Sequence, residues 1–258
     1  MAGPTTAERG ERQQLESGPP RPPRRRHLRM LIILFLVLVL TGGGSIWLLY
    51  GSPWLRVEHV SVAGTHVLTR AQVREAAGVR LGTPLISLDT DVIEARLRRK
   101  LPRIDLVDVT RSWPHGIGLK VTERIPVLIL ASEGKFIEVD RNGARFATVS
   151  TPPKGVPALK LTVDRSAAAR RFGSGRLLRA AARVARDVPA AVAHDMRTVT
   201  VRSYDSISLE LNGGRTVQWG SVEKGRAKAV ALSALMKAAS GARHFDVSVP
   251  SAPASSGS

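Results

Sequence analysis

The sequence predicts an α+β protein with a single N-terminal transmembrane helix, a small domain of order β-α-α-β-β, and a mixed, β-rich domain with two helices. A long uncharged apolar run near the N-terminus predicts the first element. Over residues 54–124, apolar residues alternate with period two on either side of two segments that carry helix signals. Beyond residue 126, short β-branched runs are separated by turn residues, which is typical of strands.

The apolar run is long enough to span a membrane. Residues 30–55 are 26 residues without a charge, and at about 1.5 Å per helical residue they would extend roughly 39 Å, more than the ~30 Å core of a bilayer. The strongest part, Leu31–Leu40, is short enough for a cleavable signal, and small residues follow it. A second apolar run with Trp47 and Tyr50 at its interfacial edge favours an uncleaved anchor at residues 30–50.

Basic residues on one side of this helix predict its orientation. The N-terminal flank carries four closely spaced arginines, Arg24, Arg25, Arg26 and Arg29, whereas Arg56 alone is basic in the first 15 residues after Tyr50. Lys and Arg favour the cytoplasmic side, so we expect a cytoplasmic N-terminus and an extracytoplasmic C-terminus. Residues 1–29 are rich in proline and lack apolar periodicity, which predicts a disordered basic tail.

Sequence signals over residues 54–124 predict a strand, two helices and a hairpin in that order. A β-branched strand near residues 57–62 precedes a helix whose Thr69 and Gln72 have the spacing of a capping box. Asp89 is the expected N-cap of a second helix. Two further alternating runs flank the turn sequence SWPHG and predict a hairpin. The three strands can form one small sheet with both helices on one face.

Residues 125–250 are predicted to form the second domain. Short strands dominate, and helices are expected at 173–187 and 222–239. His244–Val249 alternates apolar and polar residues and reads as a last strand. Residues 251–258 contain Ser, Ala, Pro and Gly and predict a flexible tail.

The composition is strongly basic. Formal net charge is +18, and residues 1–29, with seven Arg and three Glu, leave +14 for the rest. Such an excess suits an anionic neighbour such as lipid head groups or an acidic wall polymer, although a solvated arginine-rich surface is the simpler interpretation. Only 4% of residues are aromatic and the main part is expected outside the cell, so nucleic acid is not an expected partner. The role of the Arg-rich segment 165–186 stays open.

No pattern indicates catalysis, a metal or a cofactor. The chain has no cysteine, and its six histidines are scattered. Ser221 and Lys224 fit the S-x-x-K spacing of penicillin-binding enzymes, but the companion motifs are missing. Ser221 is more simply read as a helix N-cap. We therefore expect a protein that is not an enzyme and has no catalytic residues.

Several stretches in order resemble one family. The succession VSVAGTHVLTRAQVREAAGV, TPLISLDTDVIEARLRRKLPRIDLVDVTRSWPHGIGLKVTERIPV and FIEVDRNGARF is similar to the FtsQ/DivIB family of bacterial division proteins. The similarity continues through GVPALKL, KGRAKAVALSALMKA and HFDVSVPSAP, and covers about residues 28–254. In that family the β-α-α-β-β unit is a POTRA domain.

The resemblance implies a bitopic membrane scaffold of the divisome. Such a protein recruits and regulates septal cell-wall synthesis proteins at the division septum. Its implied partners are FtsB-like and FtsL-like coiled-coil division proteins, with the septal peptidoglycan synthase complex and membrane lipid as further contacts. Two alternatives remain: a POTRA-containing transport or assembly factor, and a module that binds anionic cell-wall polymers.

The last strand is the expected contact for the partner. A terminal strand can be a sheet edge on which a partner adds a strand, so the interface is predicted at His244, Phe245, Asp246, Val247, Ser248 and Val249, with Gln218 and Trp219 as possible additions. Phe245, Val247 and Val249 could instead face the core, and both readings can hold together.

Overall fold

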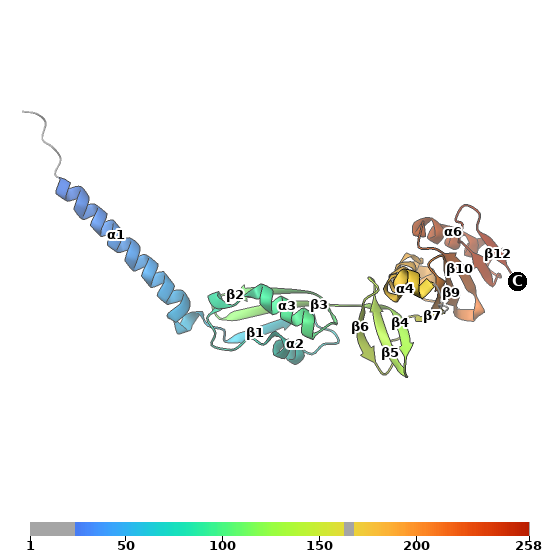
Figure 1. The fold of residues 1–258 in the computed structure, drawn as a ribbon, viewed down its shortest axis with the longest axis horizontal. Coiled ribbons are helices and arrows are strands. Elements are labelled where there is room, and N and C mark those ends of the chain that lie inside the picture. The colour runs from blue at the N-terminus through green and yellow to red at the C-terminus, as the bar shows by residue number, and fades with distance from the viewer. Residues whose placement is uncertain (1–23, 163–167, 258) are drawn as a thin grey trace, which may run out of the picture. The chain divides into compact units, whose positions relative to one another are not determined.

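The computed structural model describes residues 24–162 and 168–257. Contacts divide the chain into two compact units, residues 1–53 and 54–258, and Figure 1 shows the order of the elements. Within the second unit, two separate sheets carry two separate hydrophobic cores. The point near residues 125 and 126 where the sequence pattern changes to short strands coincides with the change from the three-stranded sheet to the nine-stranded sheet.

The apolar run forms helix α1 (Arg24–Ile46), which continues as one π-helical turn over Trp47–Gly51. Among the described residues, Leu28–Gly51 is the helix long and apolar enough to cross a membrane. The helix begins at Arg24, so the last residues of the predicted 1–29 tail are helical, and residues 1–23 lie outside the described part. The backbone of all four flanking arginines belongs to α1, because nothing in RRRHLR interrupts a helix.

The first globular part has the predicted order of elements: β1 (His59–Ala63), α2 (Arg70–Ala77), α3 (Thr90–Lys100), β2 (Ile104–Ser112) and β3 (Gly116–Glu123). The sheet order is β1-β3-β2, with β1 parallel and β2 antiparallel to β3. Both helices share one core with the sheet. The mixed α+β class and the POTRA-type order are therefore confirmed.

Local signals determine where these two helices begin. Thr69 accepts from the backbone N–H of Gln72, whose side chain accepts from Thr69 N–H, so the capping box is present. Asp89 accepts from the N–H of Val92 at 3.1 Å and caps α3. Gly78 adopts φ +61° after α2, a left-handed conformation that suits glycine.

Glu123 fixes the loop before α2 to the end of β3. Its carboxylate accepts from the backbone N–H groups of His66, Val67 and Leu68 at 2.8–3.1 Å. Burial raises the pKa of Glu123, but these three donors outweigh burial and the pKa lies below its usual value. The loop at residues 66–68 therefore lies at the end of β3 that is remote from Gly116.

The second part is a nine-stranded sheet of order β12-β11-β10-β9-β8-β7-β4-β5-β6. Its strands are β4 (Pro126–Ser132), β5 (Lys135–Asp140), β6 (Arg145–Val149), β7 (Ala158–Leu161), β8 (Met196–Ser203), β9 (Ser206–Leu211), β10 (Thr216–Gly220), β11 (His244–Asp246) and β12 (Ala254–Ser256). Its helices are α4 (Ala168–Asp187), α5 (Ala190–Ala193) and α6 (Gly225–Ala238). Buried side chains of α4, α6 and alternate strand positions form the core.

Two expected elements differ in their details. Helix α6 begins at Gly225, three residues later than predicted, because Lys224 takes φ +55° and ends the preceding turn. Ser221 is therefore not the N-cap, and its hydroxyl accepts from Glu223 N–H within that turn at 3.3 Å. Residues 254–256, predicted as part of a flexible tail, form β12.

Candidate partner-binding surface

The end of the large sheet is arranged differently from the prediction. Strand β11 pairs in parallel with β10 on one side and antiparallel with β12 on the other. The expectation that His244–Val249 is a free sheet edge is therefore wrong, because the chain turns back after Pro250 and covers that edge with three of its own residues. The edge of the sheet at this end is β12, and β6 is the edge at the other end.

Burial separates the predicted interface residues into two groups. Phe245, Val247 and Trp219 are at most 2% exposed and belong to the core. Their side chains cannot be contact residues, so the core-facing interpretation holds for Phe245 and Val247. Val249 lies beyond the strand and is 56% exposed, which corrects the expectation that it faces the core. The surface residues are His244, Asp246 and Val249, with Gln218 and Ser248 half-buried.

Backbone hydrogen bonds show which groups of the edge are open. The N–H of Val247 donates to Gln218 O at 3.0 Å, and Thr216 N–H donates to Arg243 O at 2.8 Å. The C=O of Arg243 and the N–H of Val247 therefore bond toward β10, whereas the N–H of Arg243 donates to Gly257 O at 2.8 Å on the β12 side. By alternation we infer that His244 and Asp246 bond toward β12. Their partners Ser256 and Ala254 point back at β11. The register places Ser255 opposite Phe245, and by the same alternation we infer that its N–H and C=O point to the open side.

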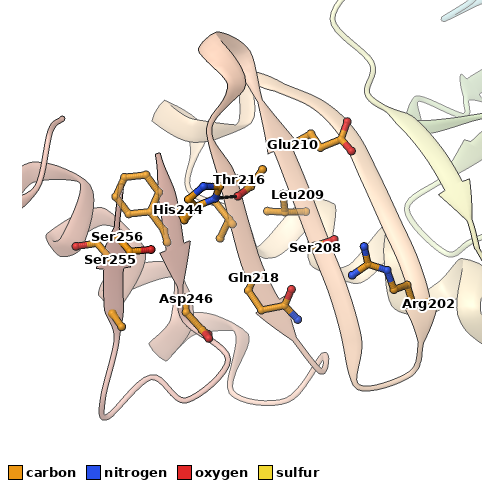
Figure 2. Close-up of a pocket in the computed structure, with 13 residues that line it drawn as sticks. Arg202, Ser208, Leu209, Glu210, Thr216, Gln218, His244, Asp246, Ser255 and Ser256 are labelled. Carbon is orange, nitrogen blue, oxygen red and sulfur yellow. Dashed lines mark hydrogen bonds between the residues drawn. The ribbon is translucent and has the colours of Figure 1, made fainter. Parts of the chain in front are cut away.

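The open face of the sheet near this edge is polar (Figure 2). The register places two rows of side chains across the strands: Glu210, Thr216, His244 and Ser256 in one, and Ser208, Gln218, Asp246 and Ala254 in the other. These residues and Arg202 line a shallow depression of about 550 Å³. A segment added beside β12 would extend both rows.

Two local contacts shape β11. Thr216 Oγ1 and His244 Nδ1 lie 2.7 Å apart and form the hydrogen bond drawn in Figure 2. Asp246 accepts from both the N–H and the hydroxyl of Ser248, at 2.9 and 2.6 Å. This turn ends the strand after Asp246 and starts the return of the chain toward β12.

Lys228 supports this surface from the core side. It is 2% exposed on α6, and its Nζ donates to Trp219 O at 2.9 Å and Ser221 O at 2.8 Å. Burial lowers the pKa of the Lys228 ammonium below its usual value, although nearby carboxylates such as Asp246 act in the opposite direction. The lysine thereby connects α6 to the end of β10, and sequence reasoning did not single it out.

A second concave surface is strongly cationic. A pocket of about 460 Å³ is lined by five arginines, Arg141, Arg176, Arg179, Arg183 and Arg186, which we call the arginine pocket. Four of them follow the spacing i, i+3, i+7, i+10 and so share one side of α4. Asp187 lies 3.9 Å from Arg183, and Asp105 lies 3.3 Å from Arg141. The pocket has the chemistry of an anion site.

In the part of the chain that the structure describes, no group of three His, Asp or Glu side chains could hold a metal ion. Ser221 and Lys224 lie in the turn before α6, and the side-chain amine that contacts Ser221 is that of Lys228, which donates to the backbone carbonyl.

Comparison with known proteins agrees with the order of elements. The family model described as POTRA domain, FtsQ-type, matches residues 55–124. The cell division protein FtsQ of Streptomyces collinus is 67% identical over 264 residues, and that of Streptomyces coelicolor is 66% identical over 267 residues, with 100% of both chains covered in each case. This chain belongs to the FtsQ family of cell division proteins. The names of these FtsQ relatives are those of division proteins and not of enzymes.

A solved structure gives a weaker match. The major extracytoplasmic domain of the division protein DivIB from Geobacillus stearothermophilus is 20% identical, with a TM-score of 0.33 that covers 45% of this chain and 94% of that one. FtsQ membership rests on the sequence relatives alone.

Proposed function

We propose that this FtsQ-family chain is a single-span scaffold of the divisome that recruits and regulates septal cell-wall synthesis proteins. The observation that carries the proposal is the open edge of β12 at the end of a nine-stranded sheet, since such an edge can accept a strand from a partner. Family membership supports the division role.

The proposed contact is pairing of a partner strand with β12. Ser255 offers one N–H and one C=O, and the polar rows ending at Ala254 and Ser256 would meet alternate side chains of the added strand. His244 and Asp246 lie one strand behind and can reach longer side chains. FtsB-like and FtsL-like coiled-coil proteins are the proposed partners, and the septal peptidoglycan synthase complex would be recruited through them.

The proposed orientation places the N-terminus in the cytoplasm and residues 54–258 outside. Its support is the arginine cluster Arg24, Arg25, Arg26 and Arg29 on one side of α1 and the nearly uncharged sequence on the other. The proposed domains remain the anchor at 30–50, the POTRA domain at 54–124 and the β domain at 125–250, to which β12 (Ala254–Ser256) adds its last strand. The tail predicted at 1–29 is shortened by the start of α1 at Arg24.

Depletion and localisation test the division role. We expect depletion of the chain to produce filaments with few or no septa, and a fluorescent fusion of the full chain to accumulate at division sites. A matched control is the same fusion carrying Lys237→Met, an exposed change on α6 that should localise normally. Even labelling of the whole membrane together with normal septation would rule the division role out.

A second candidate function has an observation of its own. The arginine pocket suits a phosphate- or carboxylate-bearing wall polymer, because guanidinium groups bind such anions through paired hydrogen bonds. This binding would coexist with the scaffold role, since α4 and β12 are different surfaces of the β domain.

Removing arginine charges from the arginine pocket tests whether it binds a wall polymer. Changing Arg179, Arg183 and Arg186 to Gln should weaken binding of the full chain to anionic wall fragments by about tenfold for each guanidinium–anion pair that is removed, and the remaining binding should fall steeply with salt. The control changes Arg70, Arg74 and Arg99 to Gln, which removes the same charge from α2 and α3. Equal weakening in both triple variants would show a nonspecific charge effect and no site.

A further inference from the structure

Three large apolar side chains are exposed in the loops and turns where the POTRA-type domain leaves α1. Trp54 is 61% exposed, Leu81 67% and Trp113 50%. They lie in three separate segments: the turn Pro53–Leu55, the loop before the short helix at Leu85–Ser87, and the β2–β3 turn. We call Trp54, Leu81 and Trp113 the tip of the domain.

Hydrogen bonds connect all three segments at residues 57 and 58. The N–H of Gly82 donates to Val57 O at 2.8 Å, which holds the loop that carries Leu81. The N–H of Glu58 donates to His115 O at 2.8 Å and holds the turn that carries Trp113. The ring of Trp54 lies edge-on to that of His115, with centroids 6.3 Å apart. The tip therefore belongs to one end of the domain.

Chain length places this end close to the membrane surface. The apolar helix extends to Gly51, and Trp54 follows three residues later. Three residues reach at most about 10 Å, and the head-group layer on each side of the ~30 Å core is roughly 5–8 Å thick. If α1 spans the bilayer, Trp54 cannot leave the interfacial region by more than a few ångströms.

We propose that the tip rests on the lipid bilayer, with the side chains of Leu81 and Trp113 in the interfacial layer beside Trp54. Tryptophan favours that layer because its ring is apolar and its N–H can bond to water or head groups. Arg80 is exposed next to Leu81 and suits lipid phosphates. Arg56 donates to Gly82 O at 2.9 Å and holds the loop that carries Leu81. The proposal rests on α1 as an anchor and is independent of which end of the chain is cytoplasmic.

This contact would restrain the domain as well as tether it. A domain held by one chain segment can rotate freely, whereas contacts at three separate segments define which side faces the membrane. The far end of the domain is then directed outward: β3 runs from Gly116 beside the tip to Glu123, seven residues further along the strand or about 23 Å away.

The end of the POTRA-type domain opposite the tip supplies a matched control site. Val67 is 65% exposed, as apolar as Leu81, and its backbone N–H is bonded to the Glu123 carboxylate. A probe at Val67 has the same local exposure as one at Leu81 but lies at the opposite end of β3. Probes at residues 81 and 67 should therefore differ in their exposure to lipid only if the tip touches the membrane.

The sequence makes the test direct, because the chain has no cysteine. The variants Leu81→Cys, Trp113→Cys and Val67→Cys of the full chain would each carry one nitroxide in lipid nanodiscs with one copy per disc. We expect spin relaxation by oxygen, relative to a water-soluble nickel complex, to be several-fold greater at residues 81 and 113 than at residue 67. Because all three side chains are exposed, the substitutions should leave the thermal unfolding temperature unchanged.

The same accessibility measurement can overturn the proposal. With no protein partner in the disc, lipid is the one surface available to the tip. If labels at residues 81 and 113 are as accessible to the nickel complex as the label at residue 67, the tip does not rest on lipid. That result would leave the division role untouched, since the depletion and localisation test is independent of it.

Discussion

Replacing Ser255 by proline is expected to weaken strongly the capture of the proposed FtsB-like partner by the full chain while leaving its fold intact. Proline removes the N–H of Ser255, which we infer to point to the open side, and places a ring where the partner strand would lie. Loss of the bond and the steric clash together should weaken binding at least about tenfold. Co-purification of the full chain with FtsB-like and FtsL-like proteins from membranes measures the effect.

Two further variants make this result specific. Ser255→Ala changes the side chain but keeps the N–H, and should capture the partner normally. Val247→Pro removes an N–H that already bonds to Gln218 O inside the sheet, so it should destabilise the fold itself. If Ser255→Pro is folded and captures the partner as well as Ser255→Ala does, strand addition at β12 is not the mode of binding.

The second large effect is a loss of folding stability, which we expect from Lys228→Met. The substitution fills a similar volume but leaves the buried carbonyls of Trp219 and Ser221 without their donor, which should cost about 2–4 kcal/mol of unfolding free energy. Lys237→Met, on the exposed side of α6, removes the same charge and should change stability little. Denaturant unfolding of the full chain in nanodiscs, followed by tryptophan fluorescence, compares the three proteins.

The cost of Lys228→Met should also depend on pH. Burial lowers the pKa of Lys228 in the fold, whereas in the unfolded chain it returns to about 10.4. Between these two values the unfolded state binds more protons, so the stability of the parent chain rises with pH in that window. The difference between parent and Lys228→Met should therefore be larger near pH 10 than at pH 7. A difference that is flat or shrinks with pH would show that the buried ammonium carries no desolvation penalty.

The sequence was most informative where local chemistry decides the structure. The Thr69–Gln72 capping box, the Asp89 cap and the glycine at position 78 each act within one turn of a helix, and the structure contains all three. The succession of strands and helices along the first domain follows from alternation and turn residues in the same way, whereas the parallel pairing of β1 with β3 depends on contacts distant in sequence. The apolar run of α1 needs no tertiary context to be recognised.

The candidate site was less predictable because its strands depend on contacts distant in sequence. Ala254–Ser256 is three residues long, exposed throughout and free of apolar periodicity, so nothing in its composition separates a strand from a tail. The turn residues Pro250 and Pro253 mark a change of direction, and that was the available signal for a returning strand. Lys228 was missed for a related reason, since a lysine on a helix is usually solvated.

Crosslinking in dividing cells tests the central claim most directly. A photoreactive residue at Ser255 of the full chain should form an adduct with a coiled-coil division protein, and the same residue at Val67, in the POTRA-type domain, should not. Adducts at both positions, or none at Ser255 while the chain still localises to septa, would contradict the claim that FtsQ function here depends on strand addition at β12.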